Sequence, residues 1–385
     1  MVLAAFHAPG IDLVLEACNA GEIFPSLHAY CISVSFPFQA LAKLHAMIFR
    51  YHSTGSTRPC PDHRAIAPTK EDVGVWVEEA PSEFIRDELK ILASISEVAP
   101  ARIPGYWHGR SGIPPKPTQS PQPGEKVFYF FHGGGYTQLS AHPQDITALI
   151  PRSLVELDDS VPRAFALEYR LSSSLPFPER FPFPAALLDA LSGYCYLVDE
   201  IGYEPSDIIL AGDSAGGNLA LALCRYLVEH KGLAGTKFPA PPGNLLLLSP
   251  WVDLSDSHDR PGSSSVTFDM DILASDIGFY SRLAFLGPFG WGFAMLNRYI
   301  SPASLHPSVQ AHFRGFPRTF IAVGAVERLL DQIRTLRDKM VSEMGEGEVT
   351  FFEAQDAIHD YAVFEWHPQR LATLKAIAMW LSEAP

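Results

Sequence analysis

A serine flanked by small residues is the feature of this 385-residue sequence that most clearly predicts chemistry. The stretch "GDSAG", residues 212–216, follows the apolar run "DIILA" and precedes an Ala/Leu-rich stretch with helical spacing. A serine on a sharp strand-to-helix turn is held above the sheet, and small neighbours let the backbone make that turn. The helix N-terminus also favours negative charge beside it. The pattern predicts a nucleophile, Ser214, rather than a purely structural turn.

A histidine should activate this serine, because a hydroxyl is a weak nucleophile until a base takes its proton. On sheets with such a turn the partners follow in the order serine, acid, histidine, each in a loop just after a strand. His359 stands in a polar loop after the apolar run "VTFFEA", whereas His367 opens the last predicted helix and suits a surface or capping role. We therefore predict that His359 is the base.

An acid is needed to hold the imidazole in one tautomer and to stabilise the imidazolium that forms. Glu327 is the preferred candidate, because it lies three residues past Gly324, at the end of the apolar run "TFIAVG". Asp331 lies one helical turn further on and is the alternative. Asp356 is close to His359 in sequence and would not reach around it easily.

Three consecutive glycines follow an earlier apolar run, in "KVFYFFHGGGY" at residues 126–136. Glycine loses more backbone freedom on folding than any other residue, so bare backbone here needs a reason. If Ser214 attacks a carbonyl, backbone N–H groups must meet the oxyanion, each worth on the order of 3–4 kcal/mol in the transition state. His132 is predicted to brace this loop through hydrogen bonds rather than act as a base. The predicted oxyanion donors are Gly134, Gly135 and Ala215.

Short apolar runs alternate with helical patterns from Lys126 onward, and these elements must position the candidate residues. Such alternation implies a mostly parallel sheet covered by helices on both faces, with the functional edge at the carboxyl ends of the strands. Two earlier strand-like runs precede a proline-rich stretch, 113–126, which we interpret as a hairpin-type excursion at the sheet edge. Helices are predicted near Pro143–Leu157, Ala185–Ile201, Gly216–His230 and Pro368–Leu381.

Two segments fall outside the alternation. Residues 263–304 are rich in aromatic side chains and are predicted to be an insertion over the functional edge. Residues 1–55 are predicted to form a separate helical segment in front of a catalytic body, residues 56–385. A helix beginning near Phe38 would present one apolar face, which we expect to pack on the body; peripheral membrane contact is the alternative.

The composition limits the classes of partner. The chain has 29 Lys and Arg against 43 Asp and Glu, and this net charge of −14 disfavours nucleic acid and anionic membrane surfaces. Its five cysteines show no CxxC spacing and predict neither a disulfide framework nor a zinc knuckle, which favours a reduced, cytoplasmic protein without a signal peptide. No HExxH or paired ligand spacing indicates a metal.

Taken together, these stretches resemble the hormone-sensitive-lipase-like branch, or fold-3 group, of the α/β-hydrolases, over about residues 126–381. The resemblance implies an α/β-hydrolase fold, carboxylic-ester hydrolysis without a cofactor through Ser214, Glu327 and His359, and a helical cap built from residues 1–55 and 263–304. Glutamate stands at 327 where many relatives have aspartate. The matching motifs are "HGGGY" (132–136), "EYRLSSSLPFPERFPFPAALLDA" (168–190), "GDSAGG" (212–217), "LLLSPWVDLS" (246–255), "GAVERLLDQ" (324–332) and "IHDY" (358–361).

The expected function is hydrolysis of a small or medium acyl ester, such as an acetate, of a hydrophobic alcohol, through an acyl-enzyme on Ser214. Acyl transfer, or cleavage of an amide such as a formamide, would use the same triad. A non-catalytic ligand receptor is the third hypothesis. Plant gibberellin receptors resemble this branch but lack the catalytic histidine, and the presence of His359 here argues against a receptor. The sequence does not indicate the oligomeric state. Substrate contacts in an apolar pocket are expected from Tyr136, Phe38 and Trp291.

Overall fold

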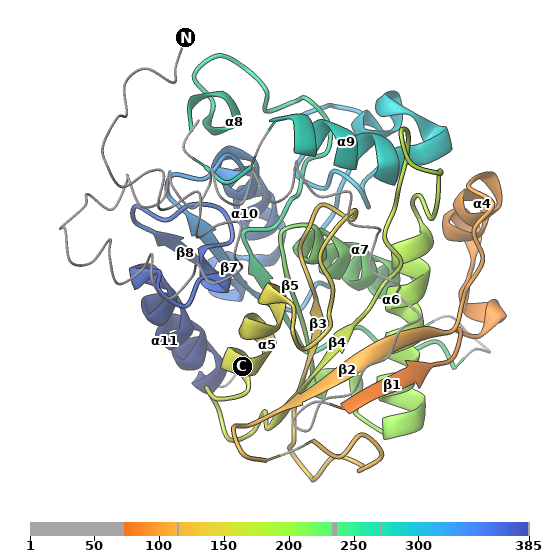
Figure 1. The fold of residues 1–385 in the computed structure, drawn as a ribbon, viewed down its shortest axis with the longest axis vertical. Coiled ribbons are helices and arrows are strands. Elements are labelled where there is room, and N and C mark those ends of the chain that lie inside the picture. Colours follow the sequence, from red (N-terminus) through yellow and green to blue (C-terminus); the bar gives the residue numbers. More distant parts are fainter. Residues whose placement is uncertain (1–72, 114, 233–236, 269–270, 274, 384–385) are drawn as a thin grey trace, which may run out of the picture. The chain divides into compact units, whose positions relative to one another are not determined.

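The structure, a computed structural model, describes residues 73–383 except 114, 233–236, 269–270 and 274 (Figure 1). The chain divides into two units, Met1–Gly55 and Ser56–Pro385, and the description below concerns the second. The predicted cap segment 1–55, with Phe38, lies outside the described residues, so its role stays a prediction.

An eight-stranded sheet with flanking helices carries the fold and confirms the predicted α/β-hydrolase architecture (Figure 1). Its strand order is β1-β2-β4-β3-β5-β6-β7-β8. The β1–β2 and β2–β4 pairs are antiparallel, and every later pair is parallel. The strands are β1 (Val73–Val77), β2 (Ile103–Gly109), β3 (Val127–Phe131), β4 (Arg163–Leu167), β5 (Ile208–Asp213), β6 (Asn244–Leu248), β7 (Arg318–Gly324) and β8 (Val349–Ala354).

The register of the parallel strands brings the candidate loops to one edge. Phe131, the last residue of β3, lies opposite Gly212 of β5, so the glycine run begins beside the serine turn. At the other end of the sheet, Gly324 of β7 lies opposite Ala354 of β8, so the loops that carry the predicted acid and base leave the sheet at the same level. In a parallel sheet this carboxyl edge is where functional side chains gather.

The four helices predicted from the sequence are present, and two of them differ from the prediction. The helix predicted near Pro143–Leu157 is shorter, because the Asp145 side chain caps a 3₁₀ turn at Ile146–Ala148 and the α-helix begins only after it. The helix predicted at Ala185–Ile201 ends in a π-helical turn, Tyr196–Ile201. The α-helices are α4 (Asp87–Ile95), α5 (Leu149–Leu154), α6 (Ala185–Cys195), α7 (Ala215–Glu229), α8 (Ser264–Thr267), α9 (Ser275–Leu286), α10 (Leu330–Met344) and α11 (Pro368–Ser382).

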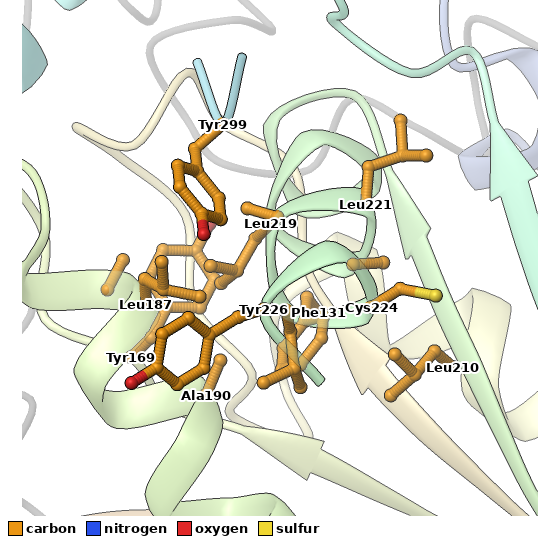
Figure 2. Packing of buried hydrophobic residues seen from close by; sticks show 14 of the residues in the cluster. Phe131, Tyr169, Leu187, Ala190, Leu210, Leu219, Leu221, Cys224, Tyr226 and Tyr299 are labelled. Atoms are coloured by element: carbon orange, nitrogen blue, oxygen red, sulfur yellow. The ribbon is translucent and has the colours of Figure 1, made fainter. Parts of the chain in front are cut away.

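Helix α7, which begins at the residue after Ser214, is buried on all sides from Ala215 to Leu227. A helix with apolar residues all round is stable only inside the protein, which explains its Ala/Leu-rich sequence. Figure 2 shows α7 packed among residues of the neighbouring sheet and of α6, with Phe131, Leu187 and Leu210 labelled. This packing fixes the N-terminus of α7, and with it the serine turn.

The hairpin interpretation of residues 113–126 is wrong. This stretch connects strands β2 and β3. These two strands are not neighbours in the sheet, because β4 lies between them. Gly105 of β2 makes room for this arrangement, since a Cβ there would lie 2.2 Å from Cζ of Phe165 in β4. The proline-rich stretch therefore connects two strands that are separated in the sheet by a third.

The aromatic-rich insertion, 263–304, connects β6 to β7 and contains α8, α9 and two 3₁₀ turns (Figure 1). It contacts the glycine loop directly: the Tyr136 and Phe285 rings stack with centroids 3.8 Å apart, and Thr137 Oγ1 lies 3.0 Å from Ser281 Oγ. Across the described part of the chain, none of the helices combines the length and apolar character needed to span a bilayer.

Candidate active site

Ser214 stands on a strained turn between β5 and α7. Its backbone has a positive φ, with φ +49° and ψ −116°, which is uncommon for a residue with a side chain. Its N–H donates to the Leu248 carbonyl at 3.0 Å, and its own carbonyl accepts from the Trp251 N–H at 2.9 Å. A Cβ at Gly216 would lie 2.0 Å from the Phe131 carbonyl oxygen, so this close approach requires glycine.

The structure brings the predicted base to the predicted nucleophile. Oγ of Ser214 lies 2.9 Å from Nε2 of His359, a hydrogen-bonding distance. On the other side of the ring, Nδ1 of His359 lies 3.5 Å from Oε1 of Glu327. All three residues are buried. The order nucleophile, base, acid is the arrangement that lets a histidine deprotonate a serine.

Glu327 is fixed by two further hydrogen bonds, both to its other oxygen. Ser249 Oγ donates to Oε2 at 2.7 Å, and the N–H of Gly324 donates to Oε2 at 2.8 Å. The Oε1 atom of Glu327 therefore remains available to His359. The longer glutamate thus reaches the ring from a carboxylate anchored on the last residues of β7 and on the loop after β6.

The alternative acids and the alternative base lie elsewhere. The Asp331 carboxylate accepts from the Ser264 N–H at 2.9 Å and joins α10 to α8. Asp356 is exposed. His367 caps α11 by accepting from the Gln369 N–H at 3.2 Å, and burial lowers the pKa of His367 to about 4.

The glycine loop packs directly on the serine turn. Gly134 and Gly135 have φ values of +104° and +61°, in the region that favours glycine. A Cβ at Gly134 would lie 2.1 Å from the Gln138 carbonyl oxygen, and one at Gly133 would lie 3.2 Å from Cβ of Ser214. Ala215 is the first residue of α7, whose first N–H groups have no acceptor within the helix. The glycine loop and the N-terminus of α7 thus both lie beside Ser214.

His132 occupies the bracing position expected for it. Its Nδ1 lies 2.7 Å from the Gly133 carbonyl oxygen, and its ring stacks on Tyr169 with centroids 4.3 Å apart. The Tyr169 hydroxyl in turn donates to the His132 carbonyl at 2.7 Å. Burial lowers the pKa of His132 to about 4, so this imidazole is neutral at ordinary pH.

The predicted substrate-contact residues have different surroundings. Tyr136 is buried, and its hydroxyl donates to Oδ1 of Asn218 at 2.7 Å, so its polar end is already engaged within the fold. Trp291 is half-buried in the insertion, where its ring lies 5.5 Å from that of Phe279. Phe38 lies outside the described residues. The substrate contacts of all three remain predictions.

Asp360 is a site residue that sequence reasoning missed. Its Oδ2 lies 3.1 Å from Nε2 of His359, the same nitrogen that faces Ser214. The signal was present in the sequence, since Asp360 directly follows His359 in "IHDY". Ser249, which follows β6 and binds Glu327, was missed as well; it stands at a strand end, the same position that identified the other site residues.

Asp271, from the insertion, joins the two loops that carry the base and the acid. Its Oδ1 accepts from the His359 N–H at 2.9 Å, and its Oδ2 accepts from the Arg328 N–H at 2.7 Å. Burial raises the pKa of Asp271 to about 6, while the nearby His359 acts to lower it. No local pattern indicates this role, because Asp271 reaches the site only through the fold of the insertion.

The charges around His359 are mostly negative. Burial alone would lower its pKa, but the carboxylates of Asp360 and Glu327 more than offset burial, and the pKa of His359 is well above its ordinary value. Burial also raises the pKa of Asp213 well above its ordinary value, with a further contribution from Asp360. Among the described residues, no group of three or more His, Cys, Asp and Glu side chains could hold a metal ion.

Known proteins resemble this chain in sequence. An acetyl-hydrolase of Streptomyces hygroscopicus is 32% identical over 248 residues, which cover 63% of this chain and 70% of that protein. An esterase of Acinetobacter venetianus is 27% identical over 66% of this chain and 73% of its own length. The esterase LipU of Mycobacterium tuberculosis is 29% identical over 67% of this chain and 78% of its own length.

Solved structures agree on the fold. A hormone-sensitive lipase from a metagenome library has a TM-score of 0.59 and 22% identity, with 89% of this chain and 98% of that chain covered. The family described as alpha/beta hydrolase fold matches residues 128–363, more than half of the sequence. The chain therefore belongs to the family with the α/β-hydrolase fold.

Proposed function

We propose that this carboxylic-ester hydrolase cleaves its substrate through an acyl-enzyme on Ser214, with His359 as the base and Glu327 as the acid. The observation that carries the proposal is the 2.9 Å approach of Ser214 Oγ to His359 Nε2 at a turn where Ser214 has a φ of +49°. A strained serine with its hydroxyl on an imidazole nitrogen is the arrangement that nucleophilic acyl transfer needs.

In the proposed first step, Ser214 Oγ attacks the ester carbonyl carbon as its proton passes to Nε2 of His359. The tetrahedral intermediate collapses, the C–O bond to the alcohol breaks, and the imidazolium returns the proton to the leaving oxygen. Water then attacks the acyl-enzyme by the same route, which releases the acid and restores Ser214. Glu327 keeps the ring oriented and stabilises its positive charge throughout.

The negative oxygen of each intermediate is met by backbone N–H groups, for which we propose Gly134, Gly135 and Ala215. The positive φ values of Gly134 and Gly135 and the close packing of the loop on Ser214 support this assignment. Such donors stabilise the transition state because they are already oriented and need no rearrangement when charge develops.

For the substrate, we propose a neutral ester of a small acyl group, such as acetate, with an apolar alcohol. The name of the acetyl-hydrolase relative supports the acyl group. The aromatic side chains of the insertion, with Phe279 56% exposed, support an apolar alcohol. The net charge of −14 disfavours anionic esters, since like charges raise the energy of approach.

Acyl transfer and amide cleavage would use the same residues, so product analysis must separate them from hydrolysis. We expect the free acid, because no acceptor alcohol is needed for the proposed second step. We also propose that the protein is cytoplasmic, as expected from the sequence. The free, buried thiols of Cys195 and Cys224 support this location.

The test is a hydrolysis screen over neutral and anionic esters that vary in acyl length and alcohol bulk, with products identified by mass. We expect acetate esters of bulky apolar alcohols to give the highest kcat/KM, and Ser214→Ala to abolish turnover. Ser192→Ala, which removes another buried serine hydroxyl far from Ser214 in sequence, should leave turnover unchanged. Equal hydrolysis by the wild type and Ser214→Ala would refute the proposal.

A further inference from the structure

Asp360 places a carboxylate on the reacting side of the base. Its Oδ2 lies 3.1 Å from His359 Nε2, and its side chain is only 11% exposed. The backbone of Asp360 is left-handed, with φ +50°, and its N–H lies 3.3 Å from Ser249 Oγ. Residue 360 is thus held where its side chain turns back toward the imidazole.

Asp360 and Ser214 contact the same nitrogen atom of His359. In the neutral ring that accepts the serine proton, Nε2 carries a lone pair, and an ionised carboxylate 3.1 Å away would repel it. In the imidazolium, Nε2 carries a hydrogen that it can donate to the carboxylate. The contact with Asp360 therefore favours the charged ring, whereas the activation of Ser214 requires the neutral one.

We propose that Asp360 is a positioning residue that acts on His359 as a second acid, at the nitrogen facing Ser214, and so sets the pH range in which Ser214 is activated. The inference rests on the proposed function, because it needs His359 to be the base for Ser214. Asp360 does not touch the substrate carbonyl; it acts only through the imidazole.

Three other carboxylates face His359 from other parts of the fold. Glu327 approaches Nδ1 from the loop after β7, Asp271 accepts the His359 backbone N–H from the insertion, and Asp213 lies at the end of β5. Among the described residues, the hydrogen-bonding and ion-pair contacts of His359 Nε2 are those with Asp360 and Ser214. Asp360 therefore differs from the other three acidic residues, because it alone competes with Ser214 for Nε2 of His359.

The charge of Asp360 is not neutralised elsewhere. Its Oδ1 is buried and has no hydrogen-bond partner among the described residues, so His359 is the cation in contact with this carboxylate. The pKa of His359 lies well above its ordinary value: burial acts to lower it, and the carboxylates of Asp360 and then Glu327 raise it. Burial raises the pKa of Asp360 as well, and the neighbouring His359 acts to lower it. The contact between the two side chains thus favours the pair of an imidazolium and a carboxylate.

The contact between Asp360 and His359 has opposite effects on the reaction rate below and above the pKa of His359. Below the pKa of His359, the protonated ring cannot take the serine proton, so Asp360 holds activity down. Above it, the same carboxylate stabilises the imidazolium that forms in the transition state, so Asp360 raises the rate. Removing the charge should make the enzyme active at lower pH and slower at high pH, and the two pH profiles should cross.

Two substitutions keep the left-handed backbone that residue 360 requires. Asn tolerates a positive φ and keeps the size of the side chain, and Gly accepts it freely with no side chain at all. Asp356 supplies the matched control, because it lies on the same loop with φ +56° but is exposed. The variants are Asp360→Asn, Asp360→Gly, Asp356→Asn and Asp356→Gly.

The experiment measures kcat/KM for a neutral acetate ester from pH 5 to pH 10, and in parallel the rate at which a fluorophosphonate inactivates the same proteins. In both Asp360 variants we expect the midpoint of the acidic limb to fall by about one pH unit or more, in both assays, because a neighbouring opposite charge is removed. The Asp356 variants should keep the wild-type midpoint.

Midpoints in the Asp360 variants that coincide with the wild type would overturn the inference, as would an equal shift in the Asp356 variants. A merely structural role for Asp360 would lower the rate at every pH without moving the midpoint. Failure of the proposed function looks different, because Ser214→Ala would then still react with the fluorophosphonate and hydrolyse the ester.

Discussion

The Nδ1 atom of His359 lies 3.5 Å from Oε1 of Glu327, and this distance is longer than the 2.9 Å that separates Nε2 from Ser214. A contact of 3.5 Å is at the limit of a hydrogen bond, so the electrostatic attraction between Glu327 and the imidazolium carries much of the interaction. The orientation of the ring then depends also on what fixes Glu327 and on the other carboxylates around His359.

Glu327→Gln should reduce kcat by on the order of 10³–10⁴-fold while the protein remains folded, because the amide can neither stabilise the imidazolium nor select the productive tautomer. Asp331→Asn is the control, since Asp331 binds the Ser264 N–H rather than His359. Its kcat should stay near that of the wild type. Kinetics with a single acetate ester compare the two, and the reverse ranking would move the acid to Asp331.

Ser249→Ala should lower kcat with little change in KM, because Ser249 donates to Glu327 Oε2 and does so away from the substrate. A hydrogen bond to a charged group contributes about 1.5–3 kcal/mol, so a loss of at least about tenfold is expected. Ser255→Ala is a matched control, since it removes a buried serine that binds another carboxylate, Asp253. An equal loss in both variants would assign the effect to general destabilisation.

Gly134→Ala should reduce kcat by about 10²–10³-fold, the effect of losing one oxyanion donor, because the new Cβ would lie 2.1 Å from the Gln138 carbonyl oxygen and move the loop. Gly112→Ala introduces the same kind of backbone strain, with φ +75°, at a place where no atom lies within 4 Å of the new Cβ. We expect Gly112→Ala to lose stability but keep its kcat. Full activity in Gly134→Ala would argue against the proposed oxyanion site.

Glu168→Gln should change how the free energy of unfolding depends on pH. Burial raises the pKa of Glu168 from 4.5 to about 7, although Ser140 and Ala141 both donate to its Oε2 and act to lower it. The folded state therefore binds more protons than the unfolded state between these values, and stability from this group falls as the pH rises through that window.

The change at Glu168 corresponds to about 3 kcal/mol between pH 4 and pH 8. Glutamine keeps an oxygen for both donors and cannot ionise, so the variant should gain stability relative to the wild type as the pH rises. Urea unfolding of both proteins at several pH values measures the difference, with the exposed Glu346→Gln as control. A constant difference across the pH range would contradict the buried, raised pKa.

The sequence predicted the parts of the site that depend on strand ends. Ser214, Glu327 and His359 each follow an apolar run closely, and parallel strands bring their carboxyl ends to one edge. The local pattern was therefore enough to select these three residues as candidates. Glu327 was preferred to Asp331 by the same reasoning, because a residue three positions past the end of a strand still lies in the loop. The structure brings these three residues together.

Other features of the fold and of the site could not be predicted from the local sequence. The antiparallel pairing of β2 with β4 depends on how Gly105 accommodates Phe165, 60 positions away in the chain. Asp271 binds the His359 backbone only because the insertion folds back over the site. The contact of Asp360 with Nε2 depends on a left-handed backbone, and a sequence pattern does not show which way the side chain then points.

Covalent labelling decides whether Ser214 is the nucleophile. The wild-type protein and Ser214→Ala are treated with a fluorophosphonate, their intact masses are measured, and labelled peptides are sequenced by mass spectrometry. We expect a single adduct on Ser214 in the wild type, because the fluoride leaves as the serine oxygen attacks phosphorus, and no adduct in the variant. An adduct that persists in Ser214→Ala, or that maps to another residue, would contradict this assignment.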